Sequence, residues 1–150
     1  NVDDQKNLQK IIAILKKIAE KMEVVFPVHP RTQKNLKKWH IDGSGLMLTT
    51  PLGYIDFLKL LSHADAVLTD SGGIQEETTI LGVPCLTLRE NTERPVTVQQ
   101  GTNRVVGTNE KKILVAVSQI LRRKNKKLRP PKLWDGKAAE RIANILYENL

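Results

Sequence analysis

Hydrophobic and polar positions along this chain alternate between two periods, one typical of helices and one typical of strands. Helical spacing of apolar residues or helix-start signals predict helices over residues 3–21, about 30–39, 54–63, 74–81, 109–123 and 136–149. Between them, short apolar runs predict strands over residues 24–28, 46–49, 66–69, 84–88 and 102–106. The polar stretch 89–101 has no clear period and is expected to be a loop.

Two of these segments carry more specific expectations about burial. The run from Val24 to Val28 is too apolar for a solvent-facing edge strand, so we expect it to be buried on both faces. In the helix over 54–63, Ile55, Leu58 and Leu61 share one face and are expected to point inward.

The alternation of strands with helices of about ten residues predicts right-handed βαβ units. The fold class is therefore α/β, a Rossmann-like parallel sheet with helices on both faces. The chain opens on a helix with no strand before it, whereas in doubly wound sheets the strand before the first helix is usually central. We therefore expect the first strand to be missing and the chain to be a fragment cut within a βα loop.

A glycine turn follows the strand over 66–69 and is the clearest candidate for chemistry. Ser71, Gly72 and Gly73 precede a helix that Gly82 closes. Glycines at a helix N-terminus let free backbone N–H groups approach an anion, with the positive end of the helix dipole behind them. The Ser71 hydroxyl is a further donor, and Glu77 could accept hydrogen bonds from a polyhydroxyl group. The alternative is an ordinary helix with a serine N-cap.

Other polar residues follow neighbouring strands, where a parallel sheet binds its ligands. Arg89 and Arg94 offer forked guanidinium groups that suit phosphate oxygens. For Arg89 a surface ion pair with Glu90 or Glu93 is an equally good interpretation, so Arg94 is the better candidate. His29 ends a predicted strand at the same edge, which favours a functional role over a structural one.

Composition limits the remaining classes of function. The chain has 150 residues, enough for one domain, and its formal net charge is +8. Seven basic residues and no acidic one lie between Arg122 and Lys132. That run has no aromatic residues for stacking bases, so a solvated connector is favoured over a nucleic-acid site.

The sequence offers no signal for a metal, a disulfide or a membrane. The three histidines have no Cys or carboxylate neighbours at metal-ligand spacing, so no metal is expected. The single Cys85 lies in an apolar run and is expected to pack in the core. With no apolar run near the ~20 residues of a bilayer span and no signal peptide, we expect a cytoplasmic protein.

Several strings resemble the non-hydrolysing UDP-N-acetylglucosamine 2-epimerases. They are TDSGGIQEE at 69–77, LGVP at 81–84 and LRENTERP at 88–95. The opening NVDD is similar to the residues that come after the family's His-Arg-x-Glu-Asn segment, and the likeness covers essentially the whole chain. It implies a single nucleotide-binding domain over 1–150, the C-terminal half of a glycosyltransferase-B-like architecture that also has an N-terminal domain.

The resemblance also implies roles for individual residues. Ser71, Gly72 and Gly73 match the family's diphosphate cradle, with Arg94 beside it. Glu77 matches the carboxylate that binds the ribose hydroxyls. His29 matches a family histidine near the diphosphate that is implicated in activity. Leu52 matches the position of a backbone contact to the base, and Phe57 matches an aromatic ring against uracil. From the pattern alone, Phe57 could equally be a core residue.

The implied reaction interconverts UDP-GlcNAc and UDP-ManNAc by eliminating UDP and adding it back, with no cofactor such as NAD. The acids and bases that act at C2 of the sugar are carboxylates of the family's N-terminal domain, so the 150-residue piece alone is expected to be inactive. Full-length members commonly form homodimers. The alternatives are the donor-nucleotide domain of a glycosyltransferase and, less favoured, a basic nucleic-acid-binding module.

Overall fold

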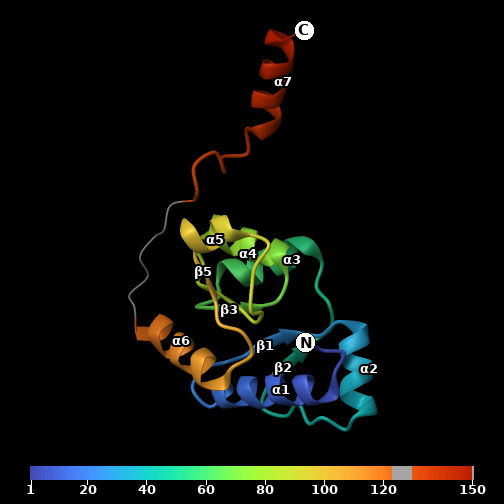
Figure 1. Ribbon diagram of the computed structural model, residues 1–150. Helices are drawn as coiled ribbons and strands as arrows, with labels where there is room; N and C mark the ends of the chain where they lie inside the picture. Colours follow the sequence, from blue (N-terminus) through green and yellow to red (C-terminus); the bar gives the residue numbers. More distant parts are fainter. Residues whose placement is uncertain (123–129, 150) are drawn as a thin grey trace.

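Strands and helices alternate along the chain as expected for an α/β protein. The computed structural model describes residues 1–122 and 130–149 (Figure 1). Its strands are β1 (Val25–Pro27), β2 (Met47–Thr49), β3 (Val67–Thr69), β4 (Cys85–Thr87) and β5 (Asn103–Val105). Its helices are α1 (Gln5–Ala19), α2 (Pro30–Lys38), α3 (Tyr54–Ser62), α4 (Gly72–Leu81), α5 (Pro95–Gln99), α6 (Glu110–Arg122) and α7 (Ala138–Glu148). All strand pairs are parallel.

The strands form two separate sheets, β1–β2 and β3–β4–β5. In β3, the Val67 N–H and the Thr69 C=O bond to the β4 side of the sheet. Because successive residues of a strand point their backbone groups in opposite directions, Leu68 between them directs its own toward the other edge, where no strand of the described residues pairs with β3. The fold class, parallel strands with helices on both faces, is confirmed.

Asn1 is held at the C-terminal edge of the β3–β4–β5 sheet. Its side-chain amide donates to the backbone C=O of Leu88 at 2.9 Å and to the Asp70 carboxylate at 3.2 Å. Both partners lie just beyond the C-terminal ends of their strands, β4 and β3.

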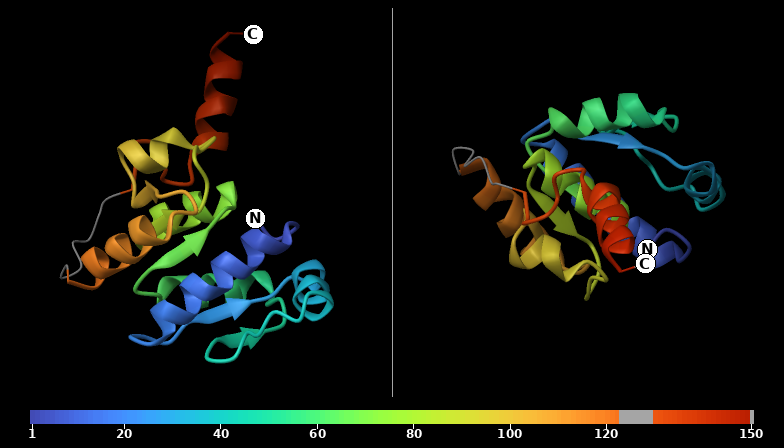
Figure 2. Two further views of the ribbon diagram at one scale, coloured as in Figure 1. Left: turned by 60° about the horizontal axis from the view of Figure 1, so that its bottom comes forward. Right: turned by 90° about the horizontal axis from the view of Figure 1, so that it is seen from above.

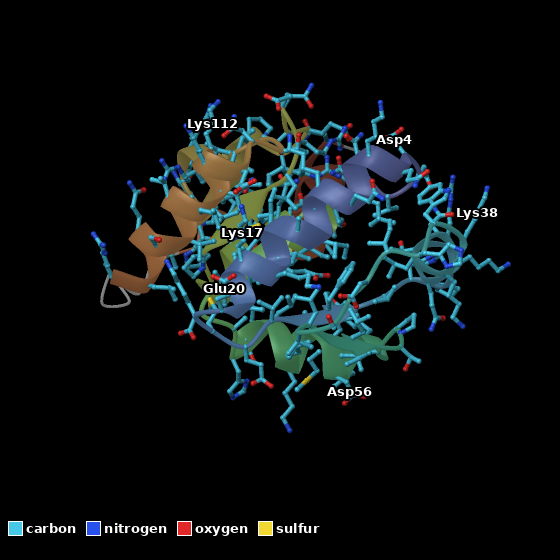
Figure 3. All side chains as sticks on the ribbon, turned by 90° about the horizontal axis from the view of Figure 1, so that it is seen from below. Asp4, Lys17, Glu20, Lys38, Asp56 and Lys112 are labelled. Atoms are coloured by element: carbon cyan, nitrogen blue, oxygen red, sulfur yellow. The ribbon has the colours of Figure 1, made fainter. Side chains whose placement is uncertain are left out.

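Helices cover both faces of the strands. α1 and α6 pack together on one side, and α3 packs against α4 on the other (Figures 1 and 2). Seen from below, α1 and α6 run side by side, and Lys17 of α1 forms an ion pair with Glu110 of α6 (Figure 3). The core lies between these helices and the strands and includes Leu8, Ile12, Leu86, Ile113 and Ala116.

Three expectations about local structure are wrong. The stretch 89–101 is not all loop, because Pro95 begins the short helix α5; its fixed φ suits a first helical position, and its missing N–H costs no bond there. Ile55 is 74% exposed, whereas Leu61 is buried and Leu58 partly buried. β1 is only partly buried, since within residues 1–122 and 130–149 no strand pairs with the edge of β1 away from β2.

The last helix, α7, contributes no buried residue and projects away from the rest (Figure 1). Ile142, Ile145, Leu146 and Tyr147 are exposed on it. Most of the basic run predicted as a connector, 123–129, lies outside the described residues. Within the part of the chain that the structure describes, none of the helices combines the length and the apolar composition of a membrane span.

Candidate functional site

The glycine turn sits between β3 and α4 at the C-terminal edge of the sheet. Ser71 is the N-cap of α4, and Gly72 and Gly73 are its first two residues. The Ser71 hydroxyl makes no capping hydrogen bond to the helix, and the side chain is exposed. The hydroxyl and the first N–H groups of α4 are therefore available to a ligand, which weakens the interpretation of Ser71 as only a helix cap.

Arg94 covers this turn. A Cβ placed on Gly72 would lie 3.7 Å from Cγ of Arg94 and 3.8 Å from its Nε. The same Nε lies 3.1 Å from the Glu76 carboxylate and is shielded from solvent, but it makes no hydrogen bond of good geometry. Arg94 thus brings a cation with unused donor capacity to the positive end of α4, which is a suitable arrangement for an anion.

The two arginines of the loop differ as the sequence suggests. Arg89 pairs with Glu93 at 3.7 Å, and both side chains are well exposed. This contact is the surface ion pair considered for Arg89, and such pairs contribute little to stability. Arg94 instead pairs with Glu76 of α4 and lies against the glycine turn.

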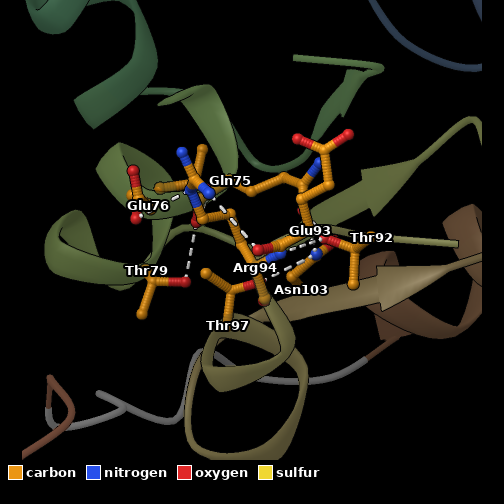
Figure 4. A network of polar contacts seen from close by, with 9 residues as sticks. Gln75, Glu76, Thr79, Thr92, Glu93, Arg94, Thr97 and Asn103 are labelled. Atoms are coloured by element: carbon orange, nitrogen blue, oxygen red, sulfur yellow. Dashed lines mark hydrogen bonds and ion pairs between the residues drawn. The ribbon is translucent and has the colours of Figure 1, made fainter. Parts of the chain in front are cut away.

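A buried polar network holds the Arg94 loop to α4 and β5 (Figure 4). Gln75 is its centre, and its side-chain carbonyl accepts from the Thr92 hydroxyl at 2.5 Å and from the Asn103 amide at 2.9 Å. Asn103 also donates to Thr97 at 3.0 Å and accepts from Thr87 at 2.7 Å. These residues were not predicted from the sequence, because their partners lie up to 28 positions apart.

The remaining candidates occupy the β1–β2 side of the same edge. His29 follows β1 and is the N-cap of α2, where its Nδ1 accepts from the backbone N–H of Arg31 at 3.3 Å. Leu52 is exposed in the loop before α3, and Phe57 is partly buried on α3. Among the described residues, no hydrogen bond or ion pair joins these three to the glycine turn.

Glu77 lies in the second turn of α4 and is partly buried, next to Glu76, which pairs with Arg94. Arg31, at the start of α2, pairs with Asp3 at 2.7 Å. Among residues 1–122 and 130–149, His, Cys, Asp and Glu side chains form no cluster of three or more that could hold a metal ion. A shallow groove between α1 and α6, lined by Met22 and Leu114, lies near the N-terminal end of β1 and so away from this edge.

Comparison with known proteins identifies the family of the chain. The model of the UDP-N-acetylglucosamine 2-epimerase family matches residues 1–147. The chain belongs to this family. It is 42% identical to the UDP-N-acetylglucosamine 2-epimerase of Methanocaldococcus jannaschii over 97% of its length, and 37% identical to that of Escherichia coli K12 over 85%.

Solved structures of family members agree with the fold. The M. jannaschii enzyme in complex with UDP-GlcNAc and UDP matches 99% of this chain with a TM-score of 0.85 and 41% identity. The Neisseria meningitidis enzyme bound to UDP-GlcNAc matches 95% with a TM-score of 0.80 and 30% identity. The chain covers 42% and 41% of these two proteins, so its parallel strands and helices match part of the glycosyltransferase-B-like epimerase structure.

Proposed function

We propose that this chain is the UDP-binding, C-terminal domain of a UDP-N-acetylglucosamine 2-epimerase. The observation that carries the proposal is the place of Arg94, whose side chain lies over Gly72 at the N-terminus of α4. A diphosphate bound here would accept from the first N–H groups of α4 and from the Ser71 hydroxyl, with Arg94 beside it. Membership of the family and the relative solved with UDP-GlcNAc and UDP support the choice of ligand.

The other contacts are inferred from the match to the family motif. Glu77 would hold the ribose hydroxyls, Phe57 would lie against uracil, and the backbone at Leu52 would contact the base. His29 would stand near the diphosphate. Its Nδ1 is occupied by the α2 N-cap, so its Nε2 is the ring nitrogen left to face a ligand.

The proposed reaction inverts C2 of the sugar while UDP leaves and returns. As the C1–O bond breaks, negative charge develops on the diphosphate. Preorganised donors aimed at that charge lower the barrier, and here they are the helix N–H groups and Arg94. The chain spans about two fifths of its relatives, and the carboxylates that act at C2 are expected on an N-terminal domain. We therefore expect no epimerisation by the 150 residues alone.

Calorimetric titration of the purified chain with UDP and with uridine tests the proposal. UDP should bind with a dissociation constant on the order of micromolar to millimolar. Arg94→Ala should weaken UDP roughly tenfold or more and leave uridine unchanged, since the lost hydrogen bonds go to a charged group. Glu77→Ala should weaken both ligands because both carry the ribose.

Arg89→Ala is the matched control, because it removes a guanidinium from the same loop that pairs only at the surface. It should leave both affinities unchanged. If Arg89→Ala and Arg94→Ala weakened UDP binding equally, the loss would follow from the change in net charge. That result would contradict a diphosphate site at Arg94. Conversion of UDP-GlcNAc by the wild-type chain would contradict the assignment of the acid and base to another domain.

A further inference from the structure

Arg94 is placed by its backbone more than by its side chain. Its guanidinium has an ion pair with Glu76 and a long hydrogen bond from Nη1 to the Glu93 C=O at 3.3 Å. Its backbone, in contrast, is bonded at both polar groups. The N–H donates to the Thr92 hydroxyl at 3.0 Å, and the C=O accepts from the Thr97 hydroxyl at 2.7 Å.

We propose that Thr92 is a positioning residue, which fixes Arg94 over the glycine turn and thereby sets the affinity for the diphosphate. The proposal rests on the proposed function for the identity of the ligand. Thr92 uses its hydroxyl in both directions: it accepts from Arg94 and donates to the Gln75 side-chain carbonyl at 2.5 Å. It is therefore the direct link between the Arg94 backbone and α4, the helix whose N-terminus faces the anion.

The anchor at the other end of this link is rigid. Gln75 is 1% exposed and Asn103 is 5% exposed. The Asn103 amide donates to Gln75 and to Thr97, while its carbonyl accepts from Thr87, so its orientation is determined by three partners. A buried polar group with satisfied partners cannot move without leaving a donor or acceptor unpaired, which carries a large free-energy cost.

The same network reaches Arg94 by two routes. One runs from Gln75 through Thr92 to the Arg94 N–H, and the other runs from Asn103 through Thr97 to the Arg94 C=O. Thr97 is fully buried, so replacing it would disturb the core, whereas Thr92 is only partly buried in the loop. Thr92 is therefore the position at which the link can be removed with the least damage to the fold.

Thr92→Val and Thr92→Ser form a matched pair for the test. Valine keeps the shape and loses the hydroxyl, whereas serine keeps the hydroxyl and loses a methyl group. Amide hydrogen exchange by NMR reports how well the Arg94 N–H is held, and calorimetry with UDP and uridine reports binding. In Thr92→Val, exchange at Arg94 should be roughly tenfold faster and UDP binding roughly fivefold weaker, with uridine binding unchanged.

Thr92→Ser should restore both the exchange rate and the UDP affinity to near wild type. The proposal would be overturned if Thr92→Val kept the wild-type exchange rate and UDP affinity. It would also be overturned if Thr92→Val and Thr92→Ser lost UDP affinity equally, because the cause would then be altered packing and not the lost hydroxyl. Exchange within α4 and the melting temperature show whether the fold is intact. If the wild-type chain does not bind UDP, the proposed function fails, and the exchange rates of the pair still decide whether Thr92 positions Arg94.

Discussion

Cys85 illustrates how burial alone changes the chemistry of one side chain. It lies in β4, the central strand of its sheet, and is fully buried. Burial raises the pKa of its thiol to about 11, although hydrogen bonds with Thr78 and Thr87 act in the opposite direction. The expectation that Cys85 is a core residue is confirmed, and a thiol held neutral in this way is a poor nucleophile.

The raised pKa of Cys85 predicts a loss of stability at high pH. The unfolded thiol ionises near 9.0, whereas the folded one keeps its proton to about 11. The free energy of unfolding should therefore fall between these pH values, by up to about 2 kcal/mol. Urea unfolding at pH 8 and pH 11 measures the change. Cys85→Ala lacks the titrating group, so an equally steep fall in that variant would contradict the assignment.

Helices and strands were largely predictable, because each is encoded by residues close together in the sequence. The expected helices and strands are all present, with ends that differ by one or two residues in most cases. α5 was missed because five residues are too few to show a period. Ile55 was misjudged because periodicity identifies a face but not whether another element covers it.

For the candidate site, the sequence predicted the place of the glycine turn and of Arg94, while the roles of the site residues stay predictions. The glycine turn is a local motif, and Arg94 could be placed beside it because parallel strands bring their C-terminal ends to one edge. The network around Gln75 could not be predicted, since a buried glutamine is rare and its partner Asn103 lies in β5, 28 positions along the chain. Such residues stand out only when three-dimensional contacts are known.

The start of α1 offers a test of stability at the level of one element. Asp4 is the N-cap, and its carboxylate accepts from the backbone N–H of Asn7 at 2.8 Å. Asp4→Ala should lower the free energy of unfolding by about 1 kcal/mol, as measured by urea denaturation.

Asp3→Ala is the control, since the neighbouring Asp3 only pairs with Arg31 at the surface. It should cost about 0.5 kcal/mol or less. A larger loss for Asp3→Ala than for Asp4→Ala would show that the ion pair, and not the cap, secures this end of the helix.

At the scale of the whole molecule, α7 stands apart from the part that carries the site. Because α7 buries no residue, deletion of residues 137–150 should change the free energy of unfolding, measured by urea denaturation, by no more than about 0.5 kcal/mol, while circular dichroism loses helical signal. Ile113→Ala in α6 removes a side chain that is 1% exposed and should cost about 3 kcal/mol, which shows the sensitivity of the assay. A similar loss on deleting α7 would show that the helix packs on the domain.

Because the described strands form two sheets, the proline of β1, Pro27, lies at a strand edge that is open to pairing. Val24 and Val28 bond to the β2 side, so Pro27 directs its backbone to the other edge. Proline has no N–H, and this edge of β1 therefore offers one donor fewer than it would with any other residue at position 27. A strand from a neighbouring molecule that paired with this edge would find no donor at Pro27. Pro27 thus acts as partial protection against unwanted edge-to-edge association.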